Sequence, residues 1–186
     1  MSAPLRTHKF TVDDYHRMAE AGLFQEDDRV ELIDGQVVRV TPIGPEHAGC
    51  VDYLARLFTG LAGNTWIVRV QNPVVLGKHA EPEPDIAVLR PRPRGYRTRH
   101  PGPDDIMLVI EVADTSLEYD RSVKIPLYAA AGIPEVWLVN LPAERIEVYR
   151  NPAAGAYAAL TSVSRGETLT PLLLPSARLS VADVLG

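Results

Sequence analysis

The chain has 186 residues, of which 46% are hydrophobic and 23% charged, enough for one globular domain with a buried core and too apolar for disorder throughout. Nineteen lysines and arginines against 24 aspartates and glutamates give a net charge of −5. The molecule as a whole therefore lacks the positive field of a protein that coats nucleic acid by charge alone, and any contact with nucleic acid must come from a local patch.

The N-terminal third carries signals for two helices and a hairpin. Residues 11–22 begin with a capping threonine, carry two acids in the first turn and end at a glycine, which predicts a short helix. Residues 29–40 hold two β-rich runs around an Asp-Gly pair, which predicts a hairpin. Residues 45–63 follow an N-terminal proline and place apolar side chains at helical spacing, which predicts the longest helix.

The middle of the chain is rich in strand signals. Strands are predicted at residues 66–70, 74–76 and 85–89. Residues 90–105 form a long loop with five arginines and a histidine among prolines and glycines. Residues 106–112 are the most apolar run and do not alternate, so we expect this strand at the centre of the sheet, covered on both faces.

The C-terminal part repeats the helix and strand pattern. A helix that ends at residue 131 leads into predicted strands at 135–140 and 145–149, and a proline-broken tail closes with a helical turn at 181–185. This order predicts one α/β domain over residues 1–186, in which helices flank a mixed β-sheet.

The remaining composition bears on compartment and partners. Cys50 is the only cysteine, which excludes an intrachain disulfide and a zinc site of several thiolates, and suits a reducing compartment. No apolar run approaches the ~20 residues of a membrane span, and residues 1–10 lack the apolar core of a signal peptide. We therefore expect a cytoplasmic protein with no membrane partner.

Two acidic residues at strand positions are the main chemical signal. Glu111 lies inside an apolar strand, where an unpaired charge would cost several kcal/mol, so either a divalent cation or a hydrogen-bonded or protonated structural glutamate is expected. Asp85 opens another apolar strand after Pro84. Together the two acids suggest a site for Mg²⁺ or Mn²⁺; alternatively, Asp85 only ends the preceding proline-rich turn.

A third feature lies in the following helix. Asp120, Lys124 and Tyr128 are spaced by four residues, the spacing of one helix face. The simpler interpretation is a surface ion pair beside a half-buried tyrosine that packs against Trp137, and we favour that packing over a hydrogen bond to a site carboxylate. Pro126 fits only the first turn of a helix or a kink, so a helix that starts near residue 122 would leave Asp120 ahead of it.

The basic loop is a candidate for contact with nucleic acid. Arg92, Arg94 and Arg97 could follow a phosphate backbone beside Asp85, since the rest of the chain is acidic. The alternative is a solvated loop with no ligand.

Taken in order, these motifs resemble a known family, the Uma-two family of restriction endonucleases within the PD-(D/E)xK nuclease superfamily. The resemblance covers about residues 11–150 and leaves 151–186 as a C-terminal extension. It rests on Glu31-Leu-Ile-Asp-Gly-Gln36, His47, Pro84-Asp85, Ile110-Glu111-Val112, Asp120-xxx-Lys124-xxx-Tyr128 and the run Ala131-Gly-Ile-Pro-Glu-Val-Trp-Leu-Val139. The superfamily expects a lysine two residues after the second acid, where this chain has Ala113; in this family the lysine is displaced to the following helix.

The resemblance implies a restriction-endonuclease-like core and a Mg²⁺-dependent DNA endonuclease. Asp85, Glu111 and the Val112 carbonyl would hold Mg²⁺ or Mn²⁺, and Lys124 would orient a water or offset developing negative charge. Glu31 would complete the site as a metal or water ligand.

His47 would contact the phosphate, and Asp120 and Tyr128 would support the site. A homodimer would be the simplest arrangement for cutting both strands. Two other hypotheses stay open from the residues: a catalytically inactive nucleic-acid-binding module with the same fold, and a metal-stabilised structural or toxin-like partner protein.

Overall fold

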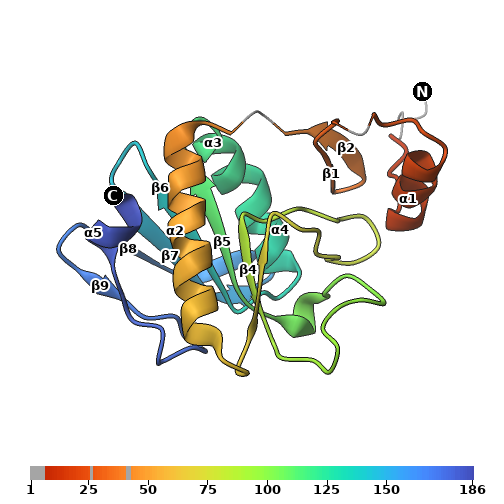
Figure 1. The fold of residues 1–186 in the computed structure, drawn as a ribbon. Helices are drawn as coiled ribbons and strands as arrows, with labels where there is room; N and C mark the ends of the chain where they lie inside the picture. Colours follow the sequence, from red (N-terminus) through yellow and green to blue (C-terminus); the bar gives the residue numbers. More distant parts are fainter. Residues whose placement is uncertain (1–6, 26, 41–42) are drawn as a thin grey trace.

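The computed structural model describes residues 7–25, 27–40 and 43–186 of the chain. Its middle layer is a six-stranded mixed sheet in the order β3-β4-β5-β6-β7-β8. Helix α2 covers one face of this sheet, the segment containing α3 and α4 covers the other, and α1 with the β1–β2 hairpin lies to one side (Figure 1). The predicted α/β fold, a mixed sheet flanked by helices, is confirmed.

The elements have the following bounds. The sheet contains β3 (Ile67–Val70), β4 (Ile86–Leu89), β5 (Ile106–Ala113), β6 (Glu135–Asn140), β7 (Arg145–Ala153) and β8 (Ala156–Ser164). Two further antiparallel pairs are β1 (Val30–Ile33) with β2 (Gln36–Arg39), and β9 (Thr168–Leu169) with β10 (Leu179–Ser180). The helical elements are α1 (Val12–Glu20), α2 (Pro45–Ala62), the 3₁₀ turn η1 (Pro103–Asp105), α3 (Leu117–Tyr119), the π-helical turn η2 (Asp120–Lys124), α4 (Ile125–Ala130) and α5 (Val181–Leu185).

Strand β5 is central, as its apolar sequence predicts. Every residue of β5 except Met107 is buried, because α2 packs on one face of the strand and α4 on the other. β5 runs antiparallel to β4 and parallel to β6, and the helical segment from α3 to α4 makes the connection that a parallel pair requires. This connection brings the helix with the predicted lysine back beside the strand with the buried glutamate.

The core is split into two layers by the sheet. On the α2 side, Phe58 and Trp137 pack with ring centroids 6.1 Å apart, and Trp66 donates its indole N–H to the Phe58 carbonyl over 2.9 Å. On the α4 side, Ile125 and Tyr128 pack on the opposite face of the same strands. Each large apolar side chain that is fully buried contributes about 1.5–3 kcal/mol to folding, so both faces of the sheet are fixed by packing.

The prediction of a strand at 74–76 is wrong. This segment is a loop that closes on itself, with the Val74 amide bonded to the Pro82 carbonyl (3.0 Å) and the Leu76 amide to the Ala80 carbonyl (2.9 Å). Its apolar character has another cause, because Val74 is fully buried against the α4-side core. An apolar run of three residues cannot distinguish a strand from a buried loop.

The sequence did not reveal β8. Its nine residues are mostly exposed and show no apolar alternation, yet they pair along their length with β7. The turn that joins the two strands, at Ala154 and Gly155, has positive φ at both residues (50° and 80°), the geometry favoured in two-residue hairpins.

Residues 1–6, part of the segment predicted to lack a signal peptide, lie outside the described residues. None of the helices in the described ranges is both long enough and apolar enough to cross a membrane.

Candidate active site

A cleft of about 470 Å³ opens where the β1–β2 hairpin, the N-terminus of α2, the end of β5 and the α3–η2 segment meet. Its walls hold most of the predicted site residues. The carboxylates are Glu31, Glu83, Asp85, Glu111, Asp114 and Asp120, and the basic residues are Arg29, Arg39, His47 and Lys124. Residues that lie up to 93 positions apart in the sequence, Glu31 and Lys124, contact each other here.

Sheet register brings the two predicted metal-binding acids together. β4 and β5 are antiparallel, and their pairing ends with Ile86 opposite Ile110. The same register carried one residue further sets Asp85 opposite Glu111, and opposite residues of an antiparallel pair project from the same face. Both side chains line the cleft.

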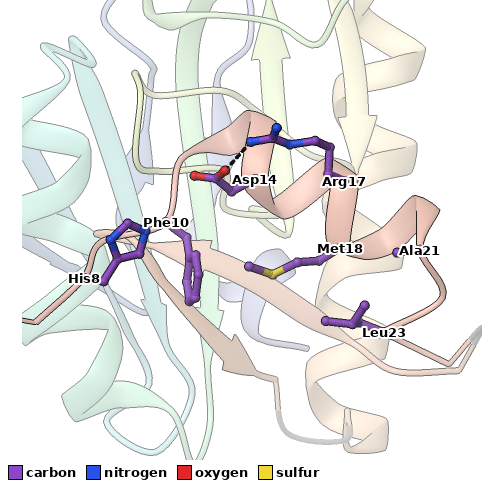
Figure 2. Close-up of a pocket in the computed structure, with 7 residues that line it drawn as sticks. All are labelled: His8, Phe10, Asp14, Arg17, Met18, Ala21 and Leu23. Atoms are coloured by element: carbon purple, nitrogen blue, oxygen red, sulfur yellow. Dashed lines mark hydrogen bonds and ion pairs between the residues drawn. The ribbon is translucent and has the colours of Figure 1, made fainter.

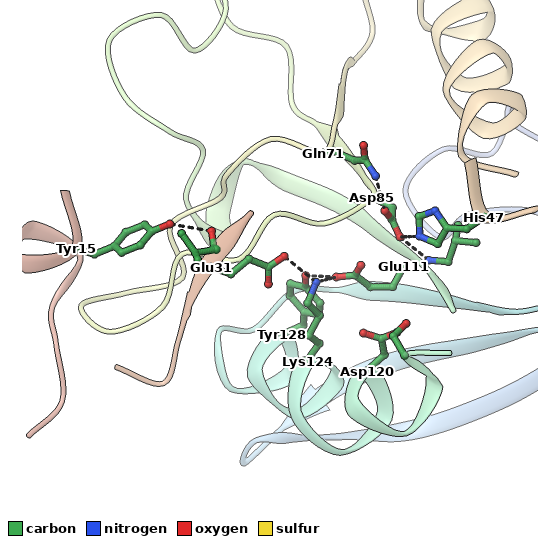
Figure 3. Close-up of polar contacts among 12 residues, drawn as sticks. Tyr15, Glu31, His47, Gln71, Asp85, Glu111, Asp120, Lys124 and Tyr128 are labelled. Carbon is green, nitrogen blue, oxygen red and sulfur yellow. Dashed lines mark hydrogen bonds and ion pairs between the residues drawn. The ribbon is translucent and has the colours of Figure 1, made fainter. Parts of the chain in front are cut away.

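Asp85 is held by three hydrogen bonds (Figure 3). Its Oδ2 accepts from the amide of Val112 over 2.9 Å and from His47 Nε2 over 3.0 Å, and its Oδ1 accepts from Gln71 Nε2 over 3.1 Å. Burial works to raise the pKa of Asp85, but the hydrogen bonds and the nearby histidine outweigh it and lower the pKa. Asp85 is therefore an anion at neutral pH.

Glu111 lies deeper and is held differently. Its Oε1 accepts from the Tyr128 hydroxyl over 2.5 Å and lies 3.2 Å from Lys124 Nζ. Burial raises the pKa of Glu111 to about 8, while the charge of Lys124 acts in the opposite direction. The expectation that Tyr128 packs against Trp137 is wrong, because the two rings belong to cores on opposite faces of the sheet.

Lys124 joins two carboxylates inside the protein. Its Nζ lies 3.2 Å from Glu31 Oε1 and 3.2 Å from Glu111 Oε1, and the residue is 6% exposed. Burial works to lower the pKa of Lys124, but the surrounding carboxylates outweigh it and raise the pKa above its usual value. The lysine displaced to the helix thus reaches the glutamate of β5, as the resemblance implies.

A π-helical turn explains how this helix presents its polar side chains. The Ile125 amide bonds the carbonyl of Asp120, five residues earlier, in a segment that is helical from residue 117 to 130. Pro126 lies in the first turn of α4, one of the two places that its chemistry allows. The helical segment nevertheless does not start near residue 122, because the widened turn before Pro126 keeps Asp120 within it. Asp120 accepts a 2.7 Å hydrogen bond from Ser116 Oγ, and burial raises the pKa of Asp120.

Glu31 reaches the cleft because the hairpin is tied to neighbouring segments. The Tyr15 hydroxyl donates to the Val30 carbonyl over 2.8 Å (Figure 3). On the other side, the Glu81 amide donates to the Leu32 carbonyl over 2.7 Å. These bonds fix β1 on both sides of Glu31, which is 3% exposed.

Arg92, Arg94 and Arg97 do not line the cleft. They follow β4, whereas Asp85 precedes it, and the four residues of β4 span about 13 Å. Within the loop, the Arg92 guanidinium lies 5.7 Å from the centre of the Tyr96 ring. Contact between this loop and nucleic acid stays a prediction, for a region away from the acidic cluster.

Several cleft residues were missed by the sequence reasoning. Gln71 bonds Asp85, Ser116 bonds Asp120, and Arg29 and Tyr119 line the walls. The backbone of Gln71 has a positive φ of 48°, and no pattern in the neighbouring sequence indicates this conformation. For Arg29, its place two residues before Glu31 in a strand was an available signal, because alternate strand residues share a face.

The oxygen atoms of this site suit a hard divalent cation. Asp85 Oδ1 accepts one hydrogen bond, and Glu111 Oε2 accepts none within the described residues. The Val112 amide points to Asp85, so the carbonyl of the same residue also faces the side where β4 has ended. Two carboxylates and a carbonyl match Mg²⁺ or Mn²⁺, which keep several waters. Across the ranges that the structure covers, no group of three or more His, Cys, Asp or Glu side chains is already arranged to coordinate a metal ion.

A second pocket, of about 310 Å³, lies beside α1 (Figure 2). Phe10, Met18 and Leu23 give it an apolar wall, and its single carboxylate, Asp14, forms an ion pair with Arg17. This pocket has no chemistry comparable to that of the cleft.

Comparison with known proteins agrees with this geometry. The family model Uma2, described as "Putative restriction endonuclease", matches residues 12–182. The chain belongs to the Uma2 family. A search of curated proteins finds no match. Among solved structures, the Uma2 chain is similar to a crystal structure titled "a putative nuclease belonging to DUF820" from Anabaena variabilis, with a TM-score of 0.72 and 16% identity over 95% of this chain and 97% of the other. At that identity the likeness shows a shared fold.

Proposed function

We propose that the protein is a metal-dependent nuclease that hydrolyses phosphodiester bonds in DNA. The observation that carries the proposal is Lys124, whose Nζ lies 3.2 Å from Glu111 in the cleft that Asp85 also lines. Two strand acids and one ammonium group are what phosphodiester hydrolysis with one bound metal needs. Membership of a restriction endonuclease family supports the same conclusion.

Asp85, Glu111 and the Val112 carbonyl would hold Mg²⁺ or Mn²⁺. When bound, such an ion would supply positive charge against the phosphate and would lower the pKa of a coordinated water. Lys124 is already desolvated and positioned, so its ammonium can donate to the attacking water or to a phosphate oxygen without reorganisation. Glu31 fixes the ammonium from the opposite side, at 3.2 Å.

His47 suits a contact with substrate. Its Nε2 is bonded to Asp85, and its Nδ1 is buried without a partner among the residues described. A buried polar atom without a hydrogen bond costs free energy. A substrate-bound water would donate to Nδ1 of the neutral imidazole, whereas Nδ1–H of the imidazolium would donate directly to a phosphate oxygen.

A second candidate is a binding module without catalysis. Asp85 has three donors, and Glu111 is paired with both Tyr128 and Lys124, so the acidic cluster is satisfied to a large extent by the protein itself. Such a network can persist in a protein that has lost its metal.

Supercoiled plasmid distinguishes the two candidates. We expect the wild-type protein to nick or linearise plasmid with Mg²⁺ or Mn²⁺ and to leave it intact with EDTA. Asp85→Asn should lose cleavage, whereas Asp114→Asn, which removes an exposed carboxylate of the same cleft, should retain it. Cleavage that survives in EDTA or in Asp85→Asn contradicts the metal-dependent mechanism, and DNA binding without any cleavage favours the binding module.

We also propose that the active form is a homodimer, since one metal site cuts one strand at a time. Support comes from β8, an edge strand of nine residues without charge or proline. Unprotected edges of this kind readily pair with another strand, and a second copy would supply one.

A further inference from the structure

The cleft carries more acidic than basic side chains, and this excess of negative charge would repel the phosphates of DNA. Its six carboxylates face three permanent cations, Arg29, Arg39 and Lys124. Lys124 is shared by two carboxylates at 3.2 Å, so its charge is already offset. A phosphodiester that enters the cleft therefore needs a positive group besides the metal and this lysine.

Arg29 and Arg39 differ in whether they form an ion pair. Arg39 forms a 2.6 Å ion pair with Asp28. Arg29 has no ion-pair partner among the residues whose positions are known. It is only partly exposed, so its guanidinium is an uncommitted charge at the cleft wall.

Strand geometry directs Arg29 into the cleft. The Val40 amide donates to the Arg29 carbonyl over 2.9 Å, which extends the β1–β2 register by one residue. Arg29 is thus on the same hairpin face as Glu31, about 7 Å along the strand. Val38 of β2 lies opposite Glu31, Val40 just after β2 lies opposite Arg29, and both valines line the cleft as well.

We propose that Arg29 binds a backbone phosphate of the DNA, adjacent to the phosphate that is cleaved. This inference rests on the proposed nuclease function and assigns the phosphate contact in the cleft to the hairpin instead of the loop that follows β4. A guanidinium suits this role because its planar array of donors matches two phosphate oxygens at once.

The test is the salt dependence of DNA binding, with Ca²⁺ in place of Mg²⁺ and a fluorescent duplex followed by anisotropy. Neutralising one phosphate contact changes the slope of log K against log salt by about 0.9. We expect Arg29→Gln to reduce the slope by about that amount and to weaken binding about tenfold. Arg29→Lys should keep the slope, because it keeps the charge, but bind more weakly.

Arg39→Gln is the matched control. It removes an arginine of the same hairpin whose partner is Asp28, so its slope should stay close to that of the wild type. Thermal midpoints of the Arg29 variants, followed by circular dichroism, should coincide with the wild type, because no folded-state ion pair of Arg29 is lost. The midpoint of Arg39→Gln should fall by at most about 4 °C, because its ion pair with Asp28 involves an exposed arginine and is worth about 0–1 kcal/mol.

Each outcome decides the proposal. A wild-type slope in Arg29→Gln overturns it, and so does an equal loss of slope in Arg39→Gln, which would indicate a diffuse effect of charge. If the wild-type protein neither binds duplex nor cleaves plasmid, the proposed function itself fails and the inference fails with it. A protein that cleaves plasmid but is insensitive to Arg29→Gln refutes only the role of Arg29.

Discussion

Replacing Lys124 by methionine should destabilise the protein as well as inactivate it. The Lys124 ammonium lies 3.2 Å from a carboxylate oxygen of Glu31 and 3.2 Å from one of Glu111. All three residues are buried, with exposed fractions of 6% for Lys124 and 3% for each glutamate. At an effective dielectric constant of about 20, the contact with Glu31 has a gross Coulomb energy of about 5 kcal/mol. The contact with Glu111, whose pKa burial raises to about 8, gains that energy only in the fraction of molecules in which this carboxyl is ionised. Desolvation offsets most of that gain in the native protein, but removing one partner leaves the others buried and unpaired, which typically costs about 3–5 kcal/mol.

Urea unfolding at pH 7 without metal would measure this cost. In a chain of this length, a loss of 3–5 kcal/mol corresponds to a fall in the thermal midpoint of about 6–20 °C. Lys9→Met is the matched control, because Lys9 pairs with Asp34 at 2.6 Å on the surface, where the side chains are 49% and 65% exposed. An exposed pair of this kind is worth about 0–1 kcal/mol.

A second substitution tests the cause of the loss. Adding Glu31→Gln to Lys124→Met removes one stranded carboxylate, so the double variant should regain more than about 1 kcal/mol relative to Lys124→Met alone. If Lys124→Met is no less stable than Lys9→Met, or if the double variant is the least stable of all, the buried network does not hold the site together and the reasoning is refuted.

Two further predictions concern regions outside the cleft. Burial works to raise the pKa of Glu147, but hydrogen bonds from Arg121, Asn140 and Tyr149 outweigh it and lower the pKa to about 2. The ionised carboxylate therefore stabilises the folded state at pH values above its unfolded pKa of about 4.5. This stabilisation is lost as the pH falls from about 4.5 towards 2. We expect urea unfolding to show that Glu147→Gln removes about 1–2 kcal/mol of this acid-dependent stability, after allowance for solvent around Arg121, and an unchanged pH dependence would contradict the assignment. For the dimer, Leu160 is the central residue of β8 and is 59% exposed, so Leu160→Lys should shift sedimentation from dimer to monomer, whereas Leu172→Lys, at a residue 51% exposed outside the strand, should not; a wild-type monomer at high concentration would rule out the β8 interface.

The central strand of the sheet could be predicted, because its sequence pattern is compatible with only one environment. A run as apolar as residues 106–113 must be covered on both faces, so its central place follows from composition. β8 could not be predicted in the same way, because an edge strand buries little and needs no apolar pattern. Conversely, the segment around Val74 was mistaken for a strand because it is apolar, although that apolar character reflects a buried loop.

The helix before β6 shows a different limit. The spacing of Asp120 and Lys124 correctly indicated one face, and both line the cleft. The missing amide of Pro126 indicates a helix start or a kink but does not distinguish the two, and the structure has both a new α-helical stretch at Ile125 and a π turn that joins it to α3. The sequence therefore left open whether Asp120 belongs to the helical segment.

The basic loop illustrates how strands separate residues that are close in sequence. Arg92 follows Asp85 by seven residues, yet β4 intervenes and carries the chain about 13 Å away before the loop begins. Lys124 follows Asp85 by 39 residues, and the connection after β5 returns it to the same cleft. Proximity in the sequence therefore does not by itself place a charge at the site, because the path of the intervening strands and helices decides where it lies. By that criterion Arg29, two residues from Glu31 on one face of a hairpin, is the better candidate for a phosphate contact at the cleft than any arginine of the loop.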